Sequence, residues 1–190
     1  NCSKDTEEKT VVVPEITYNY FFERVQSKYQ FTLNDRKVII NFNLNDITDI
    51  NELNNLFLKI DIEDGEINFS KSNLMWKKDL KISFNESFLV YDENEIKIIG
   101  NTLLEFEDLD NFYKSFQVKK DNRNRLKKIE FDFIYSVDKK TFNFDNVKID
   151  DFENENVKEY FEEFNSSLDR SFNKITFKNF ISGFFNAYAG

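Results

Sequence analysis

The chain has 190 residues, a net charge of −9 and a pI near 4.7, so it can form one domain with a core but carries the wrong charge for general nucleic-acid binding. It contains no histidine, which excludes Ser-His-Asp and Cys-His catalysis and histidine-zinc sites. With only four glycines and one proline, it has no glycine-rich phosphate loop, and most of the chain should be strand or helix.

The N-terminal part is expected to begin with a frayed tail and continue as strands. Residues 1–9 are polar, and VVVPEI then gives an extended run in which Pro14 suits a sheet edge. The segment TYNYFFERVQSKYQF fits either a strand or a helix. Residues 37–46, KVIINFNLND, alternate apolar and polar side chains and predict a strand.

A hairpin is predicted over residues 60–69, IDIEDGEINF. Apolar residues alternate with polar ones on both sides of an Asp-Gly pair, which is a strong signal for a two-residue turn. With that turn, Ile62 faces Ile67 and Ile60 faces Phe69. One face of the hairpin is therefore apolar.

The next strand is predicted from another alternating run. Leu80, Ile82 and Phe84 alternate with polar residues, and we expect Phe88 and Val90 to continue in the same phase. A polar turn near DENE then reverses the chain.

A further strand and a short helix follow. Residues 95–106 predict a strand with a bulge or bend at Gly100. A helix is expected near 108–118, capped by Asp108 or Asp110. A last hairpin follows, formed by IEFDFIYSV and TFNFDNVKI. Together these elements predict a mainly β fold, in which residues 10–150 form a curved antiparallel meander of six to eight strands with an open groove.

Residues 151–190 are predicted to form amphipathic helices at about 152–188. The final helix carries an aromatic stripe with two lysines: Lys174, Phe177, Lys178, Phe180, Ile181, Phe184, Phe185 and Tyr188. This stripe fits a helix that contacts a membrane surface or a protein partner. It fits equally well a helix that caps the open end of the sheet.

The acidic residues do not indicate an active site. Five of them alternate with apolar residues on predicted strands, as on a solvated sheet face: Asp61, Glu63, Glu66, Glu130 and Asp132. The run DIEDGEINF departs from the EF-hand pattern, and the single Cys2 fits no disulfide or metal framework. We therefore expect a protein without catalytic residues, metal or cofactor.

A basic cluster, KKDNRNRLKK at 119–128, holds six basic residues around one acid. It could contact anionic lipid headgroups or an acidic partner. A solvated loop whose first lysines complement the end of the preceding helix is favoured, because such runs usually lie on solvated surfaces.

Several strands carry apolar residues on both faces. Leu89 and Tyr91 alternate against Phe88 and Val90, and two isoleucines are adjacent in EIKIIG. A sheet with one helical layer covers one face only, so a second cover is required. More sheet, a helix or a hydrophobic ligand would supply it.

Residues 11–190 resemble the C-terminal region of the AsmA-like family of bacterial envelope proteins. The resemblance rests on the succession VVVPEITYNYFF, GEINFSKSNLMWKKDLKISF, EIKIIGNTLLEFEDLDNFYKSFQV, LKKIEFDFIYSV and the ending FFNAYAG. It implies a long curved sheet with a hydrophobic concave face, related to bridge-like lipid-transfer proteins. It also implies a periplasmic location, an inner-membrane anchor outside this chain, and a role in phospholipid transport to the outer membrane or in outer-membrane assembly.

The leading hypothesis is therefore a non-enzymatic module that holds a phospholipid or another acyl lipid, with a possible envelope protein partner. The strand phases predict a lipid-contacting face made of Leu58, Ile60, Ile62, Ile67, Phe69, Ile82, Phe84, Ile96 and Ile98. The rival hypothesis is a structural or protein-interaction β domain with a closed core and a C-terminal aromatic docking helix.

Overall fold

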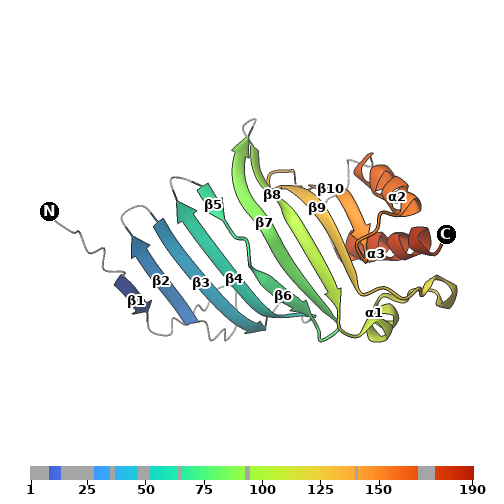
Figure 1. The fold of residues 1–190 in the computed structure, drawn as a ribbon, viewed down its shortest axis with the longest axis horizontal. Helices are drawn as coiled ribbons and strands as arrows, with labels where there is room; N and C mark the ends of the chain where they lie inside the picture. The colour runs from blue at the N-terminus through green and yellow to red at the C-terminus, as the bar shows by residue number, and fades with distance from the viewer. Residues whose placement is uncertain are drawn as a thin grey trace.

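The computed structural model describes residues 9–13, 28–34, 37–46, 52–63, 66–92, 95–139, 141–166 and 174–190. In this part of the chain, ten strands form one antiparallel sheet: β1 Lys9–Val13, β2 Lys28–Asn34, β3 Lys37–Asp46, β4 Leu53–Glu63, β5 Glu66–Asn68, β6 Asn73–Trp76, β7 Leu80–Asp92, β8 Glu95–Phe106, β9 Lys128–Ser136 and β10 Thr141–Ile149. Figure 1 shows the strands side by side, with the helices gathered at the C-terminal end of the sheet. The predicted mainly β meander with C-terminal helices is confirmed.

The strands follow one another across the sheet in chain order. β5 and β6 occupy the same position in the strand order, since both pair with β4 on one side and with β7 on the other. The strand count therefore exceeds the predicted six to eight, because this strand is divided and because β2 adds a strand where the sequence was ambiguous. The predicted strand at 37–46 matches β3.

The predicted hairpin is present in β4 and β5. Ile62 lies opposite Ile67, as the alternation predicts. The Asp-Gly turn lies outside the described residues, and β5 ends at Asn68, so the expected pairing of Ile60 with Phe69 is not part of the ladder. Beyond β5, the backbone N–H of Phe69 donates instead to the carbonyl of Ser87 on β7.

A β-bulge in β7 changes the phase of that strand. The register with β8 shifts between Asn85 and Phe88, and Glu86 has a positive φ of 43°. As a result Leu89, rather than Phe88, shares a face with Phe84. The prediction that Phe88 and Val90 continue this face was wrong, because alternation cannot reveal an inserted residue.

Gly100 makes room for that bulge. The bulge lies on β7, opposite Gly100, and not on Gly100's own strand as predicted. A Cβ atom at Gly100 would lie 2.2 Å from the Ser87 Oγ and 2.8 Å from the Ser87 Cα. A glycine is thus required by the close approach of a neighbouring backbone.

The described helices are α1 Leu109–Phe116, α2 Glu155–Ser166 and α3 Lys174–Ala189, with a 3-10 turn at Lys120–Asn122. Of the two predicted caps, Asp108 is the one used, and its side chain accepts a hydrogen bond of 2.9 Å from the Asn111 backbone N–H. α1 turns its buried residues Phe112, Tyr113 and Phe116 inward.

The core forms where the helices meet the sheet. All buried hydrophobic residues of the described chain lie between Leu80 and Phe185. α3 packs on the sheet and on both other helices: Phe177 lies on Trp76 of β6, Phe180 on Phe144 of β10 and Phe161 of α2, and Phe185 on Tyr113 of α1. Because α3 is surrounded in this way, its apolar residues face the protein on several sides.

Candidate apolar binding face

The backbone register places the predicted lipid-contacting residues on one face of the sheet. Ile62 lies opposite Ile67, which lies opposite Leu89, which in turn lies opposite Ile98. Side chains two residues apart on a strand share a face, so the alternating positions of β4, β7 and β8 follow from these pairs. The Phe69 ring meets the Phe84 ring with centroids 6.2 Å apart, which places Phe69 on this face as well.

The same face carries the helices. Ile82 lies opposite Leu104, and both pack against the buried core under α1 and α3. We call it the helix-side face. Besides the polar Thr102, it carries these apolar residues on β4 to β8: Leu56, Leu58, Ile60, Ile62, Ile67, Phe69, Leu74, Trp76, Leu80, Ile82, Phe84, Leu89, Tyr91, Ile96, Ile98, Leu104 and Phe106. Nearly every side chain on it is apolar, so it is suited to an apolar cover.

The helix-side face has two parts that differ in what covers them. Its C-terminal part belongs to the core, which includes Ile82, Phe84 and Ile98 among the residues packed against it. These three residues are partly buried and pack against core side chains; Phe84, for example, meets Phe133 of β9 with ring centroids 6.2 Å apart. The remaining part lies outside the core of the described residues. It holds the predicted lipid-contacting residues Leu58, Ile60, Ile62, Ile67 and Phe69, all partly exposed, together with their neighbours Leu56, Leu74 and Leu89. We call it the open part.

The rim of this face is exposed at one end. Tyr91 and Ile96 form a cross-strand pair at the end of β7 and β8, with 71% and 38% of their surface exposed. Of the predicted lipid-contacting residues, Ile96 is therefore the one that lies at the margin. The apolar face therefore continues to the solvent-exposed end of these two strands.

The opposite face is largely polar. The five predicted solvated acids lie on it, namely Asp61, Glu63, Glu66, Glu130 and Asp132. Lysines of the same face bind acids, as in Lys81 with Glu105 at 3.1 Å and Lys59 with Asp61 at 2.9 Å. The prediction that these acids share one face is confirmed; Glu63 and Glu66 are exposed on it, and the other three are partly buried. The bulge in β7 also brings Phe88 and Val90 to this face, where Phe88 lies opposite Ile99.

The C-terminal aromatic stripe packs against the sheet and is buried in the core. Phe180, Ile181, Phe184 and Phe185 are buried, so the predicted contact of these four residues with a membrane or partner is wrong for this structure. The remaining stripe residues Phe177 and Tyr188 pack against the same core. Capping of the sheet, the other interpretation of the stripe, is what these contacts support.

The two lysines of the stripe are placed differently. Lys178 is exposed, and its Nζ donates to the Gln117 Oε1 at 3.2 Å. Lys174 is the first residue of α3, and its side chain lies outside the described residues.

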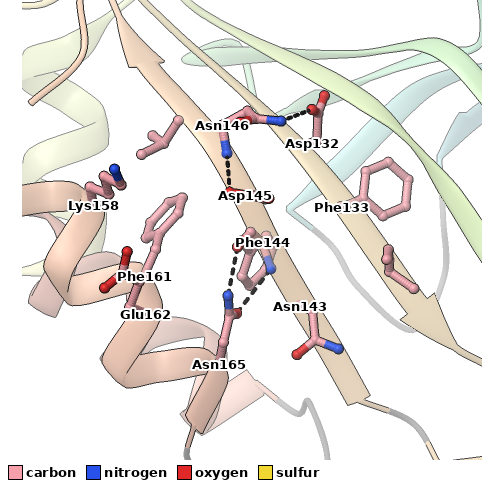
Figure 2. Close-up of a pocket in the computed structure, with 12 residues that line it drawn as sticks. Asp132, Phe133, Asn143, Phe144, Asp145, Asn146, Lys158, Phe161, Glu162 and Asn165 are labelled. Carbon is pink, nitrogen blue, oxygen red and sulfur yellow. Dashed lines mark hydrogen bonds between the residues drawn. The ribbon is translucent and has the colours of Figure 1, made fainter.

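A cleft of about 390 Å³ lies between α2 and the last two strands (Figure 2). The Asn165 carboxamide reaches the edge of β10, where its Oδ1 accepts from the Phe144 N–H at 2.9 Å and its Nδ2 donates to the Phe144 carbonyl at 2.6 Å. Asp132 accepts from Asn146 at 2.6 Å and from Asn101 at 3.0 Å. Asn165 thus satisfies backbone groups at the edge of β10, and α2 closes this edge of the sheet.

Sequence reasoning missed the role of Asn165. A single asparagine on a predicted helix carries no signal that it will pair with a strand edge. The pairing exists because α2 lies along β10, which only the folded chain establishes.

Two tyrosines, the buried Tyr113 and the partly buried Tyr160, have strongly raised pKa values. Burial raises the pKa of Tyr160 to about 12, and burial together with Tyr188 and Asp110 raises the pKa of Tyr113 to about 12. Each hydroxyl donates to a backbone carbonyl, Tyr160 to Phe180 at 3.0 Å and Tyr113 to Asn124. These phenols tie helices and loops together and stay protonated at neutral pH.

No protein-family model matches this chain, and comparisons with curated proteins and with solved structures also return no match. Within the described residues, no helix is both long enough and apolar enough to cross a membrane.

Proposed function

We propose that this chain is a non-enzymatic lipid-handling segment of an AsmA-like envelope protein. In this role the open part of the helix-side face holds the acyl chains of a phospholipid, while the headgroup stays in water. The segment supports phospholipid transport between the inner and outer membranes and outer-membrane assembly. It works in the periplasm as part of a protein anchored in the inner membrane.

One observation carries the proposal: the apolar face continues beyond the described helices that cover it. Ile60, Ile62 and Ile67 lie on the same face as the core residues, yet outside the core that the described residues form. The register extends these positions into β3, where Ile40 lies opposite Ile60 and Val38 opposite Ile62. A continuous series of branched and aromatic side chains suits an acyl chain, because each buried CH₂ group contributes about 0.8 kcal/mol without demanding a fixed geometry.

The rival function, a structural or interaction domain, is favoured by the closed core over β7 to β10. There the aromatic residues of α3 already fill the face, as Phe180 does against Phe144 with ring centroids 4.9 Å apart. The buried stripe leaves that rival without its docking helix. If the protein purifies without lipid, the structural or interaction function is the better explanation.

Substitution of the open part tests the proposal. The double variant Ile60→Asp/Ile67→Asp places two carboxylates on the open part. Covering them with acyl chains would remove their hydration, which is strongly unfavourable. We expect the wild-type protein to co-purify with phospholipid, detected by native mass spectrometry, and the double variant to lose it while its circular dichroism spectrum is unchanged.

A matched control lies on the other face. Val90 and Ile99 form a similar diagonal pair across β7 and β8, but on the largely polar side. Val90→Asp/Ile99→Asp should keep its lipid. Retention of lipid by a folded Ile60→Asp/Ile67→Asp protein, or equal loss in both variants, contradicts the assignment of this face.

A further inference from the structure

A basic surface lies at the end of the molecule that the helices close. Seven basic residues and one acid, Asp121, occur between positions 114 and 128, although the chain as a whole has a net charge of −9. Six exposed basic side chains define this basic surface: Lys114, Lys119, Lys120, Arg125, Lys127 and Lys178.

The basic surface is continuous because its segment lies along α3. Asn122 bonds to Asn186, the Tyr188 hydroxyl meets the Arg125 carbonyl at 3.5 Å, and Lys178 bonds to Gln117. Figure 1 shows the same arrangement, with the chain after α1 running beside α3. Charges from two parts of the sequence are therefore brought to one end of the fold.

These side chains differ from the lysines of the sheet in their partners. On the sheet, Lys81 binds Glu105 and Lys97 binds Asp92, and in the turn between β9 and β10 Lys139 binds Glu95. Within the described residues, no acid forms an ion pair with any member of the basic surface. An acidic protein that leaves one group of cations unpaired presents them to an external anion.

The residue types favour a diffuse anionic surface over a shaped anion pocket. Five of the six members are lysines, which act as mobile point charges, whereas arginine forks are suited to fixed bidentate recognition. The nearby Arg123 is engaged within the protein, since its Nε donates to the Val118 carbonyl at 3.0 Å and its guanidinium lies 5.9 Å from the Tyr113 ring centre. It stabilises the loop that presents the lysines.

An apolar side chain adjoins the charges. Ile175 is 73% exposed and lies one helical turn from Lys178 on α3, so the two share a side of the helix. A basic surface with an exposed branched residue at its margin combines the two attractions of an interfacial membrane contact, namely charge and shallow apolar insertion.

We infer that this basic surface docks the protein onto an anionic phospholipid bilayer. The contact is peripheral and involves lysine side chains and Ile175, while the aromatic stripe of α3 stays in the core. This inference does not rest on the proposed lipid-holding function, because it uses residues that lie outside the open part. The two are tested by different measurements, vesicle binding here and lipid co-purification above.

The test is sedimentation of the intact chain with vesicles of phosphatidylcholine, with and without phosphatidylglycerol. The variant Lys114→Gln/Lys119→Gln/Lys120→Gln/Lys127→Gln removes four charges, each of which changes binding about fivefold, so affinity for the anionic vesicles should fall by two to three orders of magnitude. Raising the salt concentration should weaken wild-type binding in the same direction. Ile175→Ser should weaken it by a smaller factor.

The control variant carries the same change in net charge elsewhere. Lys59→Gln/Lys81→Gln/Lys97→Gln/Lys139→Gln neutralises four lysines that are already paired, and its vesicle binding should stay within a few-fold of wild type. Equal binding to neutral and anionic vesicles, or equal loss in both quadruple variants, overturns the inference. Tighter binding to soluble heparin than to vesicles, with no effect of Ile175→Ser, overturns it in favour of a soluble acidic partner.

Discussion

Two parts of the sheet, around β4 and around β8, have the same strand pattern but differ in how their apolar residues are packed. β4 and β8 both alternate branched apolar residues with polar ones, yet Ile98 and Leu104 pack against the core, whereas Ile60 and Ile62 do not. The difference lies in the partner: α3 fills the face over β6 to β10, and the described helices do not bring β4 or β5 into that core. Strand pattern thus specifies which face is apolar, and helix placement specifies which part of that face is closed.

The largest expected difference between the two parts is in stability. Phe185 is 1% exposed and meets the Tyr113 and Phe184 rings with centroids 4.8 and 5.0 Å apart, so Phe185→Ala should lower the free energy of unfolding by about 3 to 5 kcal/mol. Ile60→Ala in the open part should cost less than about 2 kcal/mol, because that side chain is only partly buried. Urea denaturation measures both, and similar costs would show that the open part is as tightly packed as the core.

The bulge where the two parts meet is the next most sensitive feature. Gly100→Ala pushes a methyl group against Ser87, and we expect a loss of about 1 to 3 kcal/mol. Adding Ser87→Gly removes the Oγ and Cβ atoms from that contact and should restore part of the stability. Thermal unfolding of the single and double variants checks this, and an unaffected Gly100→Ala protein would place the bulge elsewhere.

The closed edge of the sheet can be opened by one substitution. Asn165→Ala leaves the Phe144 N–H and carbonyl without their side-chain partner, which should cost about 1 to 3 kcal/mol. Because an unprotected strand edge pairs with other chains, the variant should also associate at high concentration, as light scattering would detect. A monomeric variant of unchanged stability would show that α2 protects the edge without this side chain.

The smallest expected effect is on the pH dependence of stability. The pKa of Tyr160 is raised to about 12 from 10.0, so its contribution is fully present below pH 10 and is lost as the pH rises from 10 to 12. We expect this loss to be about 1 to 2 kcal/mol, allowing for the partial exposure of the ring. Tyr160→Phe should flatten the fall in unfolding free energy over that interval, and phenolate absorbance gives the pKa directly.

Much of the fold was predictable because it depends on local periodicity. Alternation gives the face of each strand, and Asp108 caps α1 since an acid at that position satisfies a free helix N–H. The pairing of Ile62 with Ile67 followed from a turn signal and the side-chain period of two. Periodicity failed at the β7 bulge, where one added residue reversed the faces of Phe88 and Leu89.

For the open part and the basic surface, only the residue types could be predicted from the sequence, and not which of them are covered or paired. The sequence by itself determined that one face is apolar, that the acids lie on the other, and that positions 114 to 128 are strongly basic. Tertiary structure decided that, among the described residues, Phe84 packs against the core whereas Ile60 lies outside it, and that Lys178 joins the loop lysines. The physical reason is that burial and charge pairing depend on which segments distant in sequence pack together, and no local pattern encodes that choice.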